Sequence, residues 1–545
     1  MSRNIKCLLI VFISSLLVSI FISFAYIPKA NLTWDEAESV YWTYRIFDSL
    51  KKGDANLFWQ ATADQIHYPF FQSWVFGPLL LLANYSLEKL RIAFLILYIL
   101  SSVLIYLIGK SLIKKNSELV GITASFLFIT SPVVIFYSGL FMKEMMGVFL
   151  TLLVVFLFFT AKKYKKNILF LLTGILLLLL SLTKYNYGML IAGILVIEGG
   201  IEFILSNDRR KTFFSFLLIF LPFIIGILFW VFSPNSKITD KPQFIIKILT
   251  DPAPPREKGS EDLARSLIYY PWSILETYSF SIIIGVFLLI SYAFSLFYLK
   301  DFRIRLFFMG ISINILLGIS HFPNMQVRYI ITAIPFLFIL SGFLFSFIWD
   351  KYLLIKKRGF KFGIILGVFI ILAVRIVWDF VSLPNFIYPF GAFSAGPIFN
   401  HTDYKDMNDF DRGIFILDKS SWPKKVPSGK IEKPSLVVDF VSSNLDFGKP
   451  LEVIYGFANE FSPGAFNLAF EIKKNEGKWK SLSYSSFVVT IEIFTDSKFF
   501  TNDYTFHNVW QTGEIRKVEK DPNLFLVAGK KFNELKVEAK VYGRK

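Results

Sequence analysis

The chain has 545 residues, of which 54% are apolar, 18% are aromatic and only 18% are charged, and its formal net charge is +17. Soluble globular proteins carry about 25% charged residues, so this composition, with a mean hydropathy of +0.53, excludes an ordinary soluble enzyme. The apolar residues form blocks, which excludes a disordered chain, and the single cysteine, Cys7, excludes an internal disulfide and a thiolate zinc site.

About eleven apolar runs are long enough to cross the roughly 30 Å hydrocarbon core of a bilayer. They cover residues 7–27, 90–112, 118–137, 142–160, 167–183, 186–204, 212–233, 278–299, 304–321, 327–348 and 361–382. Arg3 and Lys6 precede the first run, but its length and the lack of a small-residue cleavage site favour a retained span over a signal peptide. We therefore expect an α-helical polytopic membrane protein with about eleven transmembrane helices.

The distribution of charge orients these predicted spans. Residues 1–400 hold 36 Lys and Arg against 21 Asp and Glu, whereas residues 401–545 hold 22 against 20. With the N-terminus inside, 20 bases fall on inner segments and the short outer hairpins hold three, Lys143, Lys184 and Arg328. Because cytoplasmic loops are enriched in Lys and Arg, we expect a multi-pass protein of the cell membrane with a cytoplasmic N-terminus. The sequence shows no basic face on a soluble fold, so it does not predict nucleic-acid binding.

Two long outer loops interrupt the series of predicted spans, one after the first span and one after the seventh. The loop 28–89 is rich in aromatics, among them Trp34, Trp42 and Trp59, which favours short helices at the membrane interface. Its apolar run 69–83 is short and contains Pro78, so it predicts a re-entrant or interfacial segment rather than a span. The loop 234–277 contains the proline-rich stretch 251–255 and predicts a flexible lid.

The C-terminal part has a different pattern. Beyond about residue 400, short alternating runs such as 451–455 and 486–494 are separated by turn residues, which predicts a small all-β domain, of sandwich type. We therefore divide the chain into a transmembrane domain, residues 1–385, and an extracytoplasmic β-rich domain, residues 400–545.

Charged residues at the predicted outer surface are candidates for chemistry, because a charge near the bilayer costs a few kcal/mol unless it is paired or solvated. Asp35 and Glu36 directly follow the first span. On a helix they lie about 100° apart and cannot both face one ligand. A solvated helix N-terminus explains these two acids equally well.

The bases of the outer hairpins also have two interpretations. Lys143 and Glu144 are equally consistent with a local pair, and Lys184 and Arg328 with contacts to lipid headgroups. However, these bases share the predicted outer side with the acidic cluster. Carboxylates that activate a hydroxyl and cations that hold an anionic leaving group are what transfer from a lipid phosphate requires.

Histidine motifs add little to this prediction. His67 lies in the first outer loop, where it binds a phosphate or an acceptor, or has a structural role. The four histidines are too scattered for a zinc set, and the GxGxxG, Walker, GxSxG and HExxH motifs are absent from the sequence.

Six short motifs, in this order along the predicted spans, carry a resemblance to a known family. They are Trp34-Asp-Glu-Ala37, His67-Tyr-Pro-Phe70, Arg91, Lys143-Glu144, Leu182-Thr-Lys184 and Arg328-Tyr329. Over roughly residues 5–350 the chain resembles GT-C glycosyltransferases of the protein O-mannosyltransferase and lipid A aminoarabinose transferase type. The sequence departs from the family's pattern where His67-Tyr-Pro lacks a second proline and where Glu144 replaces Asp.

The resemblance implies a polyprenyl-phosphate sugar donor (undecaprenyl or dolichyl), a lipid, glycan or protein acceptor, and an inverting transfer at the outer face. Asp35 would be the general base. Glu36 and Glu144 would orient the acceptor or bind a divalent cation, Mg or Mn. The residues implied to hold the donor phosphate are Lys184, Arg328, His67 and Lys143.

Two other functions remain open from the sequence. The main alternative is a transporter or flippase for lipid-linked sugars. Transporters often have paired repeats and broken helices near the bilayer midplane, whereas the unusual charges of this chain cluster at one surface, which favours the enzyme. A non-catalytic scaffold that presents the β domain would leave that polar cluster unexplained.

Overall fold

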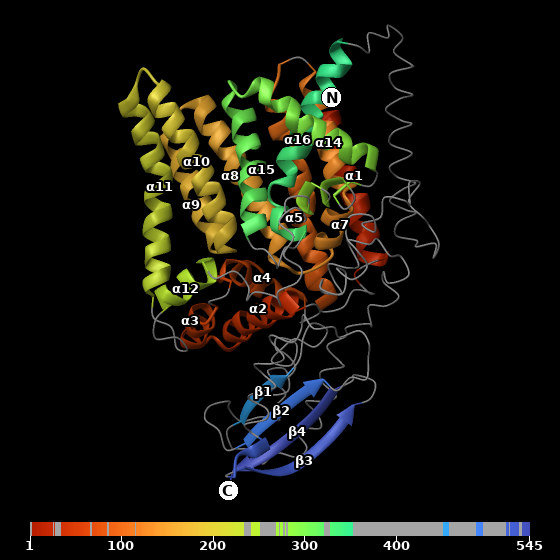
Figure 1. Ribbon diagram of the computed structural model, residues 1–545, viewed down its shortest axis with the longest axis vertical. Coiled ribbons are helices and arrows are strands. Elements are labelled where there is room, and N and C mark those ends of the chain that lie inside the picture. The colour runs from red at the N-terminus through yellow and green to blue at the C-terminus, as the bar shows by residue number, and fades with distance from the viewer. Residues whose placement is uncertain are drawn as a thin grey trace.

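The computed structural model in Figure 1 places most of the described chain in helices. It describes residues 3–25, 27, 34–65, 68–83, 87–114, 116–233, 241–250, 269–271, 273–275, 278–279, 282–320, 327–351, 451–456, 487–493, 519–522, 524–532 and 537–544. The helices of the main bundle are α1 (Arg3–Ala25), α5 (Leu87–Ser111), α6 (Ser117–Ile129), α7 (Pro132–Ser138), α8 (Lys143–Tyr164), α9 (Asn167–Ser181), α10 (Tyr185–Leu205), α11 (Arg209–Phe232), α14 (Ile282–Ser295), α15 (Phe302–Ser320) and α16 (Ile334–Lys351), with the short 3-10 helices η2 (Leu296–Tyr298) and η3 (Val327–Ile330).

The bundle is built of apolar helices of membrane-spanning length. Within the described ranges, six helices are long and apolar enough to cross a membrane, or seven if α6 and α7 form one span bent by 65°. The bend falls at Pro132, because proline has no N–H to continue the hydrogen bonds of α6. Shorter apolar helices lie in the predicted runs 167–183, 278–299 and 327–348. The eleventh predicted run, 361–382, lies outside the described residues.

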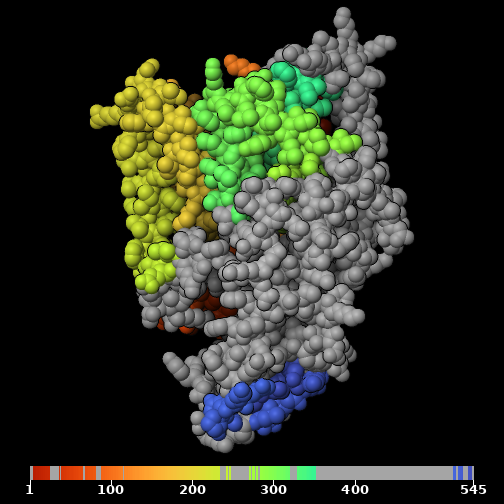
Figure 2. Space-filling model, viewed as in Figure 1, coloured from red at the N-terminus to blue at the C-terminus, as the bar shows by residue number. Residues whose placement is uncertain are grey.

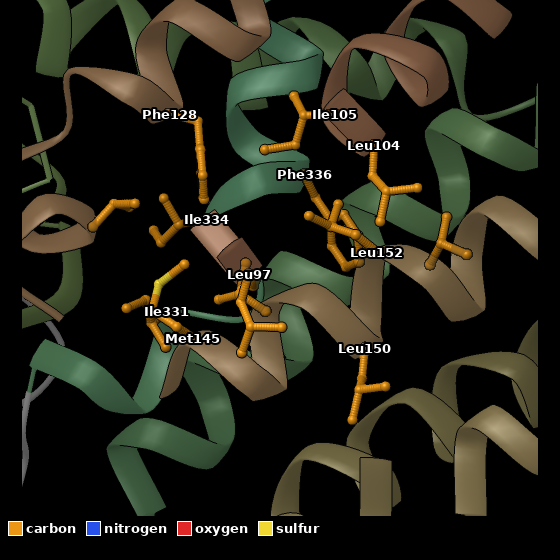
Figure 3. Close-up of a cluster of buried hydrophobic side chains, with 14 of the residues drawn as sticks. Leu97, Leu104, Ile105, Phe128, Met145, Leu150, Leu152, Ile331, Ile334 and Phe336 are labelled. Carbon is orange, nitrogen blue, oxygen red and sulfur yellow. The ribbon is translucent and has the colours of Figure 1, made fainter. Parts of the chain in front are cut away.

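The core of the bundle forms where α5, α6, α8 and α16 pack together. In Figure 3, side chains of α5, α6 and α8 gather with those at the start of α16. Phe128, Met145 and Phe336 are buried there. Since lipid tails are as apolar as these side chains, close packing holds such helices together in a bilayer.

The outer sides of the bundle are apolar and exposed. Helix α11 forms one side of the bundle (yellow in Figures 1 and 2), and only 11% of its most apolar stretch is buried. Phe213, Leu221 and Phe229 are exposed on it. Such a helix is suited to face lipid, because its exposed side chains are apolar and its backbone N–H and C=O groups are hydrogen-bonded within the helix.

Four helices lie together at one end of the bundle, here named the α2–α4 end (Figure 1). They are α2 (Trp34–Lys52), α3 (Ala55–Ala63), α4 (Phe71–Ala83) and α12 (Lys241–Thr250). Helix α3 starts where Asp54 accepts a hydrogen bond from the N–H of Leu57 at 2.9 Å, as an N-cap does. Helix α4 continues through Pro78, and α12 lies within the loop that the sequence predicts to be a lid.

The opposite end of the bundle, named the basic end, carries the positively charged ends of the helices. Because consecutive spans alternate in direction, α8 begins at the α2–α4 end and finishes at the basic end with Lys162 and Lys163. The charge distribution predicts that the α2–α4 end is the extracytoplasmic one.

The described strands near the C-terminus form one four-stranded sheet in the order β1-β2-β4-β3. They are β1 (Leu451–Gly456), β2 (Phe487–Ile493), β3 (Leu524–Phe532) and β4 (Val537–Arg544). The predicted strands 451–455 and 486–494 coincide with β1 and β2, which confirms the β-rich character. The pairing of β1 with β2 is parallel and the others are antiparallel. A parallel pair needs a crossover connection, and the predicted sandwich stays a prediction.

Candidate active site

A buried ion pair joins the start of α2 to the start of α5. Arg91 donates from Nε to Oε1 of Glu36 at 2.7 Å and from Nη2 to Oε2 at 2.6 Å. The N–H of Phe141 also donates to Glu36 Oε1, at 2.7 Å. The Glu36 side chain is 0% exposed and that of Arg91 is 2% exposed. Glu36 therefore holds α2, α5 and the loop before α8 together, and both of its carboxylate oxygens already accept hydrogen bonds.

Lys143 and Glu144 begin α8 and reach different partners. The Lys143 ammonium donates to Ser39 Oγ of α2 at 2.9 Å and lies 4.5 Å from the ring centroid of Tyr68. The Glu144 carboxylate instead accepts a hydrogen bond from Lys184 Nζ at 3.1 Å. These two neighbouring charges thus connect α8 to separate segments of the α2–α4 end.

Glu144 also lies beside Arg328, so that two cations share one carboxylate oxygen. Arg328 Nη1 is 4.0 Å from the same Glu144 Oε1 that accepts from Lys184. All three side chains are largely buried, since that of Glu144 is 2%, that of Lys184 6% and that of Arg328 12% exposed. Together with Lys143, three cationic side chains and one carboxylate therefore lie close together among the described residues.

Three tyrosine rings surround Lys184. Its ammonium lies 5.4 Å from the ring centroid of Tyr68, 4.8 Å from that of Tyr187 and 6.0 Å from that of Tyr329. Aromatic rings at such distances stabilise a cation, and Lys184 also donates to the Tyr187 hydroxyl at 3.4 Å. We call these tyrosines, with Lys143, Glu144, Lys184 and Arg328, the cation–tyrosine cluster.

Close helix packing positions Lys184 and Tyr187. Lys184 is the N-cap residue of α10. A Cβ at Gly188 would lie 1.7 Å from Ser181 Oγ of α9, and one at Gly147 would lie 2.4 Å from the Tyr187 ring. Only glycine permits both approaches, so these two residues fix the α9–α10 hairpin and lay Tyr187 against α8.

The same hairpin is tied to the other helices of the α2–α4 end. The N–H of Phe71 donates to the carbonyl of Leu182 at 3.0 Å. Trp230 of α11 donates to the Tyr185 hydroxyl at 2.8 Å, and Lys241 of α12 donates to the Trp230 carbonyl at 2.7 Å. Burial lowers the pKa of Lys241 to about 8. The first residues of α10 are therefore enclosed by α4, α11 and α12.

Two predicted site residues are less fully described. Asp35 is the second residue of α2, but its side chain lies outside the described residues, and His67 lies outside them altogether. The backbone of Asp35 adjoins Glu36, which Arg91 anchors. Their roles as base and phosphate ligand stay predictions.

The described side chains do not fit the predicted divalent cation. Among the described ranges, no group of three or more His, Cys, Asp and Glu side chains is arranged to hold a metal ion. Both oxygens of Glu36 already accept hydrogen bonds, and Glu144 is flanked by Lys184 and Arg328, whose charges repel a metal ion. The described surroundings of Glu36 and Glu144 therefore favour cationic side chains over a bound metal ion.

Charged residues at the basic end show a different arrangement. Arg305 binds Glu198 with two hydrogen bonds of 2.8 and 2.6 Å, and Lys162 pairs with Glu202. These two cations and two carboxylates are balanced, and they connect the ends of α8, α10 and α15. Because these charges pair with one another, we assign them a structural role.

Sequence reasoning assigned no role to several residues of this site. Tyr68, Tyr187 and Tyr329 lie within or next to the quoted motifs, but aromatic residues are so common in this chain that they gave no separate signal. Arg91 was one of the motifs that carry the family resemblance, but the sequence did not indicate that Glu36 is its partner. A search for tyrosines within three residues of His67 and the outer bases would have found the three rings, together with Tyr185.

Comparisons with known proteins bear on the fold of the chain. A comparison with curated protein sequences gives no match. The model of the family described as dolichyl-phosphate-mannose-protein mannosyltransferase matches residues 67–237, a range that contains Tyr68, Glu144 and Lys184.

Two crystal structures of ArnT from Cupriavidus metallidurans resemble the chain over its whole length. Each is 11% identical and covers 97% of both chains, with a TM-score of 0.54 for the form bound to undecaprenyl phosphate and 0.53 for the apo form. The Archaeoglobus fulgidus oligosaccharyltransferase tethered to an acceptor peptide is 12% identical over 86% of this chain and 62% of its own, with a TM-score of 0.50. At such identities the likeness establishes the fold: this chain is a polytopic membrane protein with the fold of the GT-C glycosyltransferases.

Proposed function

We propose that this protein transfers a sugar from a polyprenyl-phosphate donor, undecaprenyl or dolichyl phosphate, to an acceptor hydroxyl at the α2–α4 end. The observation that carries the proposal is the cation–tyrosine cluster, in which Lys184 and Arg328 flank Glu144 and Lys143 lies against the Tyr68 ring that also faces Lys184. The mannosyltransferase family match and the likeness to ArnT bound to undecaprenyl phosphate support it. The proposal also sets the α2–α4 end and the C-terminal sheet outside the cell membrane and the N-terminus in the cytoplasm.

The reaction would be a single displacement. Asp35 takes the proton of the acceptor hydroxyl, the hydroxyl oxygen bonds to the anomeric carbon, and the bond from that carbon to the phosphate oxygen breaks. The configuration inverts, and the lipid phosphate leaves with one more negative charge. Lys184 and Arg328, held by Glu144, stabilise that charge as it develops, and one such fixed donor is worth about 3 kcal/mol of the barrier.

Binding of undecaprenyl phosphate to the purified protein in detergent tests the phosphate site. A charge-assisted hydrogen bond contributes roughly 1.5–3 kcal/mol, so Lys184→Met should weaken binding on the order of tenfold to a hundredfold. The matched control is Lys162→Met, which removes a lysine paired with Glu202 at the basic end. Equal affinity of Lys184→Met and wild type would contradict the proposed site.

The catalytic step needs a separate measurement. Asp35→Asn should bind undecaprenyl phosphate as wild type does and lose sugar transfer, because only the proton acceptor has changed. Mass spectrometry of envelope lipids, glycans and proteins from a deletion strain would identify the acceptor that loses a sugar. Accumulation of the lipid-linked sugar on the inner leaflet would instead favour a flippase.

A further inference from the structure

Gln72, the second residue of α4, is a buried amide that the protein does not satisfy. The residue is 1% exposed, and neither its amide nitrogen nor its amide oxygen has a hydrogen-bond partner among the described residues. Burying a polar group without a partner destabilises a fold, so an unsatisfied amide with both donor and acceptor unused calls for an explanation.

A second glutamine nearby shows how a structural amide is treated in the same region. Gln65, also 1% exposed, donates to the carbonyl of Ala61 at 3.0 Å and accepts from Ser73 Oγ at 2.6 Å. The two glutamines therefore have the same chemistry and the same burial but differ in their hydrogen bonds. This difference marks Gln72 as an amide whose hydrogen-bonding capacity the described residues do not use.

Helix geometry places Gln72 beside the candidate active site. Gln72, Phe76 and Leu80 follow one another at intervals of four residues and are each 1% exposed, so they form one buried stripe of α4. The Phe76 ring lies 5.3 Å from that of Phe141, whose N–H binds Glu36. Gln72 lies one turn before Phe76, nearer the N-terminus of α4. Side chains on a helix lean toward its N-terminus.

The segment that precedes α4 also contributes to the cation–tyrosine cluster. Tyr68 comes four residues before Gln72, and its ring lies 4.5 Å from Lys143 Nζ and 5.4 Å from Lys184 Nζ. The N–H of Phe71, the residue directly before Gln72, donates to the carbonyl of Leu182, two residues before Lys184. Gln72 therefore belongs to the turn of α4 that adjoins the segment carrying Lys184.

We infer that the Gln72 amide hydrogen-bonds a hydroxyl of the donor sugar and so selects the sugar; this inference rests on the proposed function. A hydroxyl both donates and accepts and therefore satisfies both halves of an amide. A phosphate offers only acceptors, and a lipid chain offers neither. Because the anomeric carbon is bonded directly to the phosphate, the sugar must lie next to the cation–tyrosine cluster, near the start of α4 that carries Gln72.

Gln72→Met tests the inference because methionine has similar length and volume but no amide. The probes are undecaprenyl phosphate alone and undecaprenyl phosphates that carry mannose, glucose or a pentose. Wild type should bind one sugar-bearing lipid more tightly than the bare lipid. Gln72→Met should bind the bare lipid as wild type does and bind the preferred sugar-bearing lipid about tenfold more weakly, as expected for the loss of the hydrogen bonds between the amide and the sugar hydroxyl.

Thermal unfolding without ligand separates recognition from a structural role. Gln72→Met should unfold at the same or a higher temperature than wild type, since it removes an unsatisfied buried amide. The matched control Gln65→Met should unfold at a lower temperature, since it breaks two hydrogen bonds.

Three outcomes would overturn the inference. The first is a sugar preference that survives in Gln72→Met, and the second is an equal loss of affinity for the bare lipid. The third is a Gln72→Met variant that unfolds as early as Gln65→Met, which would make Gln72 structural. If wild type binds none of the lipids, the proposed function itself fails and the inference fails with it, and that result differs from the other three.

Discussion

Removing Arg91 should strongly destabilise the protein, because Arg91 neutralises a carboxylate that is 0% exposed. In Arg91→Leu, Glu36 would keep the hydrogen bond from the N–H of Phe141 but lose two charge-assisted bonds of 2.7 and 2.6 Å. Breaking a buried pair by removing one partner typically costs about 3–5 kcal/mol. We expect Arg91→Leu to lose that much of its free energy of unfolding.

A double-mutant cycle measures the pair directly. Glu36→Gln, Arg91→Leu and the double variant are unfolded in detergent by SDS titration, followed by tryptophan fluorescence. The double variant should lose less stability than the two single variants lose together, because it leaves no buried charge behind. Additive losses, or an Arg91→Leu protein as stable as wild type, would refute the reasoning.

The basic end provides a control for the effect on function. Arg305→Leu leaves Glu198, which is also 0% exposed, without its partner. We expect a similar loss of stability but unchanged affinity of the folded protein for undecaprenyl phosphate. Arg91→Leu should lower sugar transfer beyond its loss of folded protein, because Glu36 anchors the turn of α2 that carries Asp35.

Two further predictions concern packing and protonation at the α2–α4 end. Gly147→Leu should weaken undecaprenyl phosphate binding, because its side chain would displace Tyr187, whereas Gly193→Leu, with no atom within 4 Å of an added Cβ, should bind normally. The pKa of Lys241 falls from 10.5 to about 8 on burial, so between these pH values the unfolded chain holds a proton that the folded chain has released. Stability should therefore rise with pH in this window, and Lys241→Met should lack this rise when thermal unfolding is followed from pH 8 to pH 10.

The sequence predicted the bundle well because apolar length and loop charge are local properties. Each predicted span from 7–27 to 327–348 contains a helix, and Lys143, Lys184 and Arg328 meet because alternating spans bring their hairpins to one end. Pro78 shows the limit of a local rule, since α4 continues through it in a helix that packs on α2.

Pairing could not be predicted, because it depends on how helices are rotated against one another. Lys143 and Glu144 are adjacent in sequence, but they turn to Ser39 and Lys184 on different segments. Glu36 finds its partner Arg91 55 residues away. Gln72 and Ser73 are neighbours of similar polarity, and only the structure distinguishes the buried amide without a partner from the paired hydroxyl.

Two groups of charged side chains, one at each end of the bundle, differ in composition, and this difference bears on where the chemistry occurs. At the basic end, Lys162 and Arg305 pair with Glu202 and Glu198 and hold helices together. At the α2–α4 end, the described part of the cation–tyrosine cluster holds three cations and one carboxylate. Fixed cations stabilise a negative charge that develops beside them, so this cluster is suited to a leaving phosphate. The proposed mechanism supplies that anion as the phosphate of the donor.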